Sequence, residues 1–176
     1  MIRRLIPTVV AVLVAAGCSG DSVDPSATYF EDAAAISTQY ETSALSHFTE
    51  YRTSLEGATA ETGDDIFVEA NQSLFANLAD AFGTAVTGLA DLTPPSEAAS
   101  QHDAWVAAAR TLNDAFQSAD DQLSTLTEAP AANSVVSSLP LADLQAAYRT
   151  ACEGVAALAD GDSGTAIACE PPGNGA

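Results

Sequence analysis

The stretch SEAASQHDAWVAAARTLNDAFQSADDQLSTL, residues 96–126, decides the fold class. Its apolar side chains, together with one histidine, recur at alternating steps of three and four residues, which places them on one face of an α-helix. The residues on this face are His102, Trp105, Ala109, Leu112, Phe116, Ala119, Leu123 and Leu126. Such an alternation is typical of the seam along which the helices of a bundle pack. It predicts a long amphipathic helix that begins at Ser96.

Three further stretches show the same spacing, and they are separated by Gly63, by Thr93-Pro94-Pro95 and by the Pro130 to Pro140 segment, which we interpret as breaks. The first is expected to begin at Thr28, because a Thr followed three residues later by Glu31 forms a capping box. Its apolar face is Tyr29, Ala33, Ile36, Tyr40, Ala44, Phe48, Tyr51 and Leu55.

The second stretch is expected to begin at Asp64 or Asp65 and the fourth near Pro140, a residue suited to a first helical turn. The apolar face of the second is Phe67, Ala70, Leu74, Leu78, Ala81, Ala85 and Leu89. That of the fourth is Leu141, Leu144, Tyr148, Ala151, Val155 and Leu158. No strand pattern competes with these helices.

Four amphipathic helices joined by short or moderate loops predict an all-α fold, an up-down-up-down four-helix bundle over residues 28–160. The chain is long enough for one such domain with a sizeable core. The alternative is a three-helix core with a loosely packed first helix, because that first helix is rich in serine and threonine.

The N-terminal segment predicts export. Residues 1–17 combine Arg3 and Arg4 with an apolar run, Leu5 to Ala16, that is too short to span a bilayer. Ala15-Ala16-Gly17-Cys18 follows and resembles a lipobox, at which lipid is attached to the cysteine thiol before the leader is cleaved. This segment differs from the usual lipobox at Ala15, a position where leucine is preferred. The alternative is an ordinary secretory peptide, and the export route, Sec or Tat, stays open.

This N-terminal pattern predicts a protein held at the extracytoplasmic face of the cell membrane by lipid on Cys18. Residues 18–27 are then a lipidated cysteine with a flexible tether. A single acyl chain binds membranes only reversibly, so stable anchoring needs the further chains that such cysteines receive.

The charge balance narrows the possible partners. The chain has a formal net charge of −19, and all 24 acidic residues follow Cys18, where only Arg52, Arg110 and Arg149 oppose them. Acidic lipids and nucleic acids would be repelled, so no nucleic acid is expected as a partner. The acidic surface instead favours a basic protein partner.

Two cysteines remain once Cys18 is lipidated. The remaining cysteines, Cys152 and Cys169, are even in number, and the chain is predicted to enter an oxidising compartment. A disulfide between them is therefore predicted. It would tie the C-terminal tail, residues 161–176, back onto the last helix. The competing redox function is disfavoured because the chain has no Cys-x-x-Cys motif.

The two histidines are the first candidates for chemistry. With a rise of about 1.5 Å per residue, His47 and His102 lie at heights that differ by roughly 20 Å in the predicted topology, so they cannot share one metal ion. The Glu-x-x-His motif of di-metal bundles is absent, since Ala44 and Ala99 stand three residues before them. We expect His102 to be partly buried, hydrogen-bonded to one acid and raised in pKa; a metal or ligand contact is the alternative.

A second candidate is Asp160-Gly161-Asp162-Ser163-Gly164, which superficially resembles a calcium loop. The register does not fit an EF-hand, because the sixth and twelfth positions are Thr165 and Pro171. A helix end followed by a turn explains the same residues. The candidate metal ligands to test are therefore His102, Asp160, Asp162 and Glu170.

Catalysis has no sequence support. The chain lacks a Gly-x-Ser-x-Gly elbow, a phosphate-binding glycine loop and a His-Glu-x-x-His motif, so we expect no enzyme and no cofactor. Trp105 and the tyrosines could line a ligand pocket, although aromatic residues at seam spacing more often belong to the core.

The lipobox, the alanine-rich helical body, Leu92-Thr93-Pro94-Pro95 leading to His102, and Cys152 with Cys169 together resemble small uncharacterised lipoproteins of high-GC Gram-positive bacteria. Only the lipobox is specific among these features. The resemblance implies an extracytoplasmic helical domain of unknown role and transfers no catalytic or binding residue. The sequence therefore favours a non-catalytic envelope module that binds a protein or small ligand or is structural, with metal handling by acidic residues as the alternative.

Overall fold

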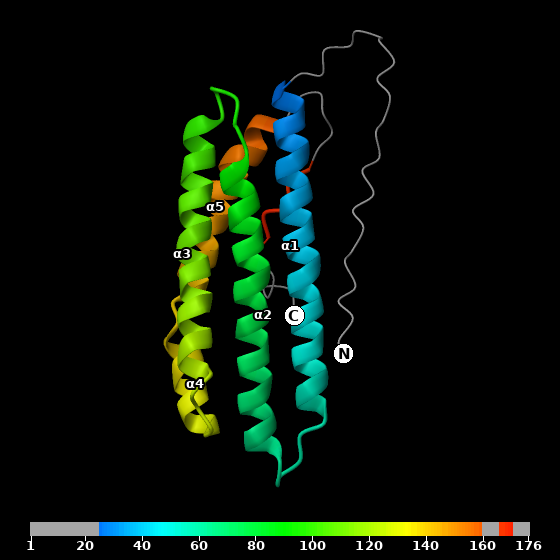
Figure 1. Cartoon of the computed structure of the whole chain (residues 1–176), viewed down its shortest axis with the longest axis vertical. Coiled ribbons are helices and arrows are strands. Elements are labelled where there is room, and N and C mark those ends of the chain that lie inside the picture. The colour runs from blue at the N-terminus through cyan, green and yellow to red at the C-terminus, as the bar shows by residue number, and fades with distance from the viewer. Residues whose placement is uncertain (1–24, 160–165, 171–176) are drawn as a thin grey trace, which may run out of the picture.

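The computed structural model describes residues 25–159 and 166–170, and all its secondary structure there is helical (Figure 1). The helices are α1 (Pro25–Glu56), α2 (Gly63–Asp91), α3 (Ala99–Leu123), α4 (Ala129–Ser138) and α5 (Leu141–Ala159). Among these residues, no helix is both long enough and apolar enough to cross a membrane.

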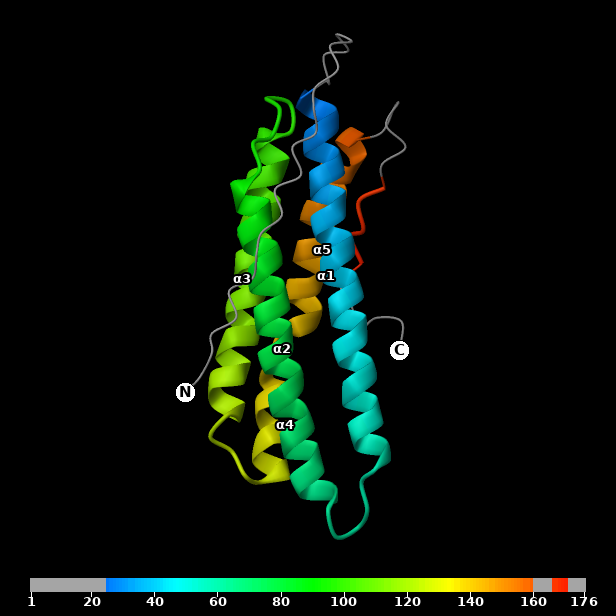
Figure 2. The ribbon, with the colours of Figure 1, turned by 45° about the vertical axis from the view of Figure 1, so that its right-hand side comes forward.

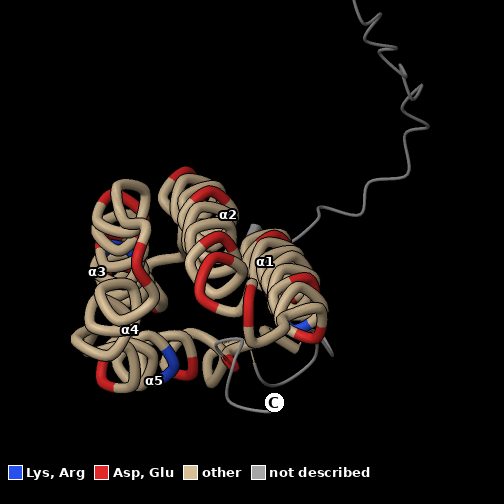
Figure 3. The backbone as a smooth tube through the Cα atoms, turned by 90° about the horizontal axis from the view of Figure 1, so that it is seen from below, with Lys and Arg blue, Asp and Glu red and all other residues tan. Residues whose placement is uncertain are grey.

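The four long helices run alternately down and up, which confirms the predicted up-down-up-down bundle (Figures 1 and 2). The order of packing follows the chain: α1 packs on α2, α2 on α3, and α3 on α5. The fourth side of the bundle, between α1 and α5, is packed less closely than the other three, because these two helices contact each other only slightly. Figure 3 shows Asp and Glu distributed over all four long helices.

The predicted seam of α3 is the centre of the core. Every position from His102 to Leu123 on that face is buried, and Leu126 is partly buried. Aromatic rings from other helices meet this seam: Phe82 of α2 lies 5.8 Å from Phe116 and 5.4 Å from Tyr148, measured between ring centroids. The strict alternation of three and four residues therefore identified the core correctly.

The first helix belongs to the bundle, so the alternative of a three-helix core is wrong. Tyr29, Ala33, Tyr40 and Ala44 are all buried. Burial weakens after Ala44, where the apolar face continues with residues that are only partly buried, namely Phe48, Tyr51 and Leu55. The first half of α1 is thus a core element, whereas the second half packs less completely.

Three helix starts differ from the predictions, the smallest difference being α2, which begins at Gly63 rather than at Asp64 or Asp65. α1 begins at Pro25 rather than Thr28, so the predicted capping box of Thr28 and Glu31 lies inside the helix, and part of the predicted tether is helical. Proline is favoured in a first helical turn because its fixed φ suits the helix and its missing N–H would have no partner there. α3 begins at Ala99 rather than Ser96, after a turn in which the N–H of Ala98 donates to the carbonyl of Pro95 (2.9 Å).

The Pro130 to Pro140 segment separates α3 from α5, as the sequence predicts, but it also contains a short helix that the sequence did not predict. It contains α4, which has a proline at its beginning and one buried residue, Ala132. Pro130 lies in the first turn, where its missing N–H costs nothing, and α5 begins directly after Pro140. The prolines therefore delimit a short helix instead of excluding one.

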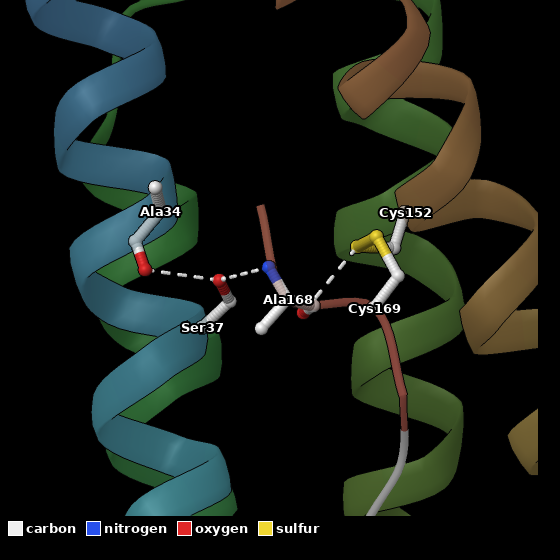
Figure 4. Close-up of a disulfide and its surroundings, with 5 residues drawn as sticks. All are labelled: Ala34, Ser37, Cys152, Ala168 and Cys169. Carbon is white, nitrogen blue, oxygen red and sulfur yellow. Dashed lines mark hydrogen bonds between the residues drawn. A yellow bond between two sulfur atoms is a disulfide. The ribbon is translucent and has the colours of Figure 1, made fainter. Parts of the chain in front are cut away.

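The C-terminal strap, which we define as residues 166–170, lies between α1 and α5 (Figure 4). The Cys152–Cys169 disulfide joins it to α5, as the sequence predicts, with 5.5 Å between the Cα atoms. On the other side, the N–H of Ala168 donates to Oγ of Ser37 (3.2 Å), and this hydroxyl donates to the carbonyl of Ala34 (3.0 Å). The strap thus bridges two helices that contact each other little.

Candidate ligand cavity between the helices

An apolar cavity of about 220 Å³ lies where α1 diverges from α5. The strap contacts α1 at Ser37, and the α1 residues of the cavity come after Ser37. The cavity therefore lies beyond the strap, toward the C-terminal end of α1. The residues that line it are Tyr40, Phe48, Tyr51, Asn71, Leu74, Phe75, Leu78, Phe116, Val136, Leu141 and Gln145. All five helices therefore contribute to its wall.

None of the described residues that line the cavity carries a charge. Its floor is formed by buried side chains of α2 and α3, namely Leu74, Phe75, Leu78 and Phe116. The amide of Asn71 is engaged, since its Nδ2 donates to the carbonyl of Phe67 (2.8 Å). Apolar walls with a few polar groups are typical of sites for small uncharged molecules.

Tyr40 is the unusual member of this lining. Its side chain is 4 % exposed, and its hydroxyl oxygen has no hydrogen-bond partner among the described residues. Burial raises the pKa of Tyr40 far above its ordinary value, and the neighbouring Tyr148 raises it further. The phenol is therefore neutral and keeps its proton. A buried hydroxyl without a partner costs about 1–3 kcal/mol of folding stability.

A second hollow, of about 260 Å³, lies on the other side of Tyr40 between α1 and α2. Small and polar side chains line most of it, namely Gln39, Ser43, Ala81, Thr84, Ala85 and Gly88, together with Ile36. Tyr40 lines both spaces and so stands between them. Apart from Tyr40, this hollow has none of the aromatic and leucine side chains that line the apolar cavity.

The other aromatic candidates divide between core and cavity. Trp105 is fully buried and Tyr148 is 2 % exposed, so both belong to the core as the seam spacing indicates. Burial raises the pKa of Tyr148 to about 12, and the nearby Trp105 indole lowers it slightly, although no hydrogen bond of ordinary geometry reaches the indole nitrogen. Of Trp105 and the tyrosines, only Tyr40 and Tyr51 line the cavity.

His102 is buried more completely than predicted, and the predicted acidic partner is wrong. Its Nδ1 lies 3.0 Å from the hydroxyl of Tyr29, and the two rings are in edge contact. Burial lowers the pKa of His102 from its ordinary value of 6.5, and the neighbouring Asp103 opposes this shift. The prediction of a raised pKa is therefore also wrong, because the hydroxyl of Tyr29 supplies no negative charge.

The remaining metal candidates are not brought together. Asp160 and Asp162 lie outside the described residues, and Glu170 pairs with Arg149 (3.0 Å). His47 lies 3.5 Å from Glu50 on the surface of α1. Within residues 25–159 and 166–170, no group of three or more His, Cys, Asp or Glu side chains could hold a metal ion.

Cys18, the predicted lipidation site, also lies outside the described residues. No protein-family model, curated protein or solved structure matches the chain. The arguments for function therefore rest on the sequence and on the geometry of the bundle.

The sequence did not point to the cavity itself. Its only signal was the presence of tyrosines, Tyr40 and Tyr51 among them, on a face where most other positions are hydrocarbon side chains. A tyrosine on a seam brings a hydroxyl that needs a partner, and the sequence does not show whether the fold supplies one.

Proposed function

We propose that this protein is a lipid-anchored, extracytoplasmic module of the cell envelope that binds a small apolar molecule without transforming it. The observation that carries the binding proposal is the uncharged cavity of about 220 Å³ walled by Leu74, Phe75, Leu78 and Phe116. An engineered apolar cavity of about 150 Å³ suffices to bind benzene, so a space of this size is adequate for a small ring or a short chain.

The anchoring part of the proposal is supported by the sequence. The short apolar leader and Ala15-Ala16-Gly17-Cys18 resemble the export and lipidation signals of small lipoproteins from high-GC Gram-positive bacteria. Non-catalytic binding is supported by the absence of nucleophile, phosphate-loop and zinc-protease motifs from the sequence.

The binding proposal is tested by titrating the protein with small aromatic hydrocarbons and following backbone amide NMR signals. We expect saturable shifts in residues around the cavity and a ligand-dependent rise in melting temperature. Shifts that spread over the surface without saturation would contradict a defined site.

Val136 provides a variant that closes the cavity. It lies on the wall and is only partly buried, so Val136→Phe should fill the space with little strain. The matched control is Val135→Phe, on the same short helix but outside the lining. We expect the first variant to lose at least about tenfold in affinity and the second to retain it. Equal affinity in both variants would place the ligand elsewhere.

A basic protein partner remains a separate proposal, supported by the net charge of −19. Association steered by charge weakens as salt rises, whereas binding in an uncharged cavity depends little on salt. Repeating the titration at low and high ionic strength therefore distinguishes the two modes of binding.

A further inference from the structure

The inference concerns the regulation of the apolar cavity and rests on the proposed function. The strap, residues 166–170, is attached to both of the helices that diverge at the cavity (Figure 4). On the α1 side, Oγ of Ser37 accepts a hydrogen bond from the N–H of Ala168 (3.2 Å). On the α5 side, Cys152 forms the disulfide with Cys169. The strap therefore ties together the side of the bundle where α1 and α5 contact each other only slightly.

The attachment points of the strap border the cavity. Tyr40 lines the cavity and lies three residues after Ser37 on α1. Gln145 lines it from α5 and lies four residues before Arg149, which pairs with Glu170 of the strap (3.0 Å). Each of these steps corresponds to about one helical turn. The strap thus fixes the separation of the two helices at one edge of the cavity.

The other sides of the bundle do not depend on the strap. α1 packs on α2, and α5 packs on α3, along much of their length. The beginning of α1 is also joined to α3, because the hydroxyl of Tyr29 lies 3.0 Å from Nδ1 of His102. The part of α1 that borders the cavity packs less completely, since Phe48 and Tyr51 are only partly buried. Loss of the strap should therefore open the side between α1 and α5 while the helices stay folded.

The disulfide is the attachment that a chemical reaction can break and remake. Cys152 is fully buried, whereas Cys169 is partly exposed. A thiolate of a dithiol reductant can therefore attack Sγ of Cys169, and Sγ of Cys152 leaves. The second thiolate of the reductant then displaces Sγ of Cys169 from the mixed disulfide. Each departing sulfur takes up the proton that the attacking thiol released, so the protein gains two thiols and the dithiol becomes a disulfide.

The contacts that survive reduction are too weak to hold the strap in place. They include the hydrogen bond to Ser37, the ion pair of Glu170 with Arg149, and the buried side chain of Ile167. A single hydrogen bond and a solvent-exposed ion pair contribute little to stability. Fixing the backbone of residues 166–170 costs conformational entropy at every position. Reduction should therefore release the strap from α1.

We propose that the Cys152–Cys169 disulfide controls ligand binding in the cavity. With the disulfide formed, the strap holds α1 and α5 at the separation at which the apolar walls contact the ligand. Reduction by a dithiol lets the two helices separate, so the ligand loses part of these contacts and dissociates. The protein thus binds its apolar ligand in an oxidising environment and releases it on reduction.

The test measures the affinity for toluene from backbone amide shifts. Toluene is titrated into the oxidised protein, into the protein reduced with dithiothreitol, and into the double variant Cys152→Ser, Cys169→Ser. A further variant, Ser37→Ala, keeps the disulfide and removes only the attachment to α1. Its matched control is Ser43→Ala, on the same helix but lining the other hollow. Circular dichroism follows the helix content of every sample.

We expect reduction to weaken toluene binding at least about tenfold without loss of the helical signal. The double variant should bind as weakly as the reduced protein and should not respond to dithiothreitol. Ser37→Ala should bind toluene more weakly than Ser43→Ala while both keep the disulfide.

Equal affinity of the oxidised and reduced proteins would overturn control by the disulfide and leave the proposed function standing. Loss of the helical signal on reduction would also contradict the inference, because the disulfide would then hold the whole fold rather than one side of the bundle. Equal affinity in Ser37→Ala and Ser43→Ala would contradict the role of the tie to α1. If the oxidised protein does not bind toluene, the proposed function itself fails.

Discussion

The hydroxyl of Tyr29 on α1 lies 3.0 Å from Nδ1 of His102 on α3, although the two residues are 73 positions apart. The hydroxyl donates when His102 carries its proton on Nε2 and accepts in the other tautomer, so this hydrogen bond can form in both neutral forms. This pair lies near the beginnings of two helices that start at the same end of the bundle. It joins helices that are separated by α2 in the order of packing.

The burial of His102 predicts acid sensitivity. Because its pKa is lowered below 6.5 in the folded protein, the unfolded chain binds the proton more readily. The free energy of unfolding should therefore fall as the pH drops below 6.5 and be unaffected well above that value. Urea denaturation at a series of pH values measures this slope. His102→Gln should flatten it, and an unchanged slope in this variant would contradict the assignment.

Removal of the unpartnered hydroxyl should stabilise the free protein. Tyr40→Phe keeps the ring contact with Phe82, whose centroid lies 4.4 Å away, and abolishes the cost of a buried donor without an acceptor. We expect the free energy of unfolding to rise by about 1 kcal/mol, measured by urea denaturation without ligand. Tyr29→Phe serves as the contrasting variant, because it breaks a hydrogen bond and should be destabilising. A loss of stability in Tyr40→Phe would show that its hydroxyl is already paired.

The disulfide should contribute most of the stability of the strap. Reduction, or replacement of both Cys152 and Cys169 by alanine, releases a loop with a sequence separation of 17 and should cost about 3 kcal/mol in the chain-entropy account. Ser37→Ala, which removes the acceptor for Ala168, should cost about 1 kcal/mol. The two effects should not add, because the hydrogen bond depends on a strap held in place. Additive losses in a double-mutant cycle would show that the two attachments act independently.

Lipidation is tested in cells with the full-length chain. Cys18→Ala should abolish incorporation of labelled fatty acid and move the protein from the membrane fraction to the soluble fraction. Substitution of Cys152 and Cys169 should leave the membrane association intact, since those residues carry no predicted lipid. Retention of Cys18→Ala in the membrane fraction would contradict anchoring through this residue.

The fold could be predicted from spacing because the helices are long and their apolar faces are regular. Between His102 and Leu123, the spacing of three and four residues recurs so regularly that it identifies one face of the helix as buried. α4 has only ten residues and two flanking prolines, so its periodicity is too short to compete with the break signals of Pro130 and Pro140. Long helices are thus predicted from their pattern, whereas short ones between prolines are not.

The cavity could not be predicted, because it depends on how far neighbouring helices diverge. Spacing identifies Tyr40, Leu74 and Phe116 as inward-facing, but it does not reveal that α1 and α5 fail to meet beside them. The partner of His102 was missed for a related reason. Spacing places His102 on a buried face but does not show which side chain meets it, and Tyr29 pairs with the ring without contributing charge.

The strap also has a consequence for the order of events in biogenesis. Ser37 meets Ala168 across 131 positions, so the last side of the bundle closes only after nearly all of the described chain has been synthesised. The covalent part of this closure needs an oxidant that the cytoplasm does not provide. A chain bound for export would therefore stay incompletely closed while it must still be threaded through a translocation channel. It would reach its final form only on the far side of the membrane.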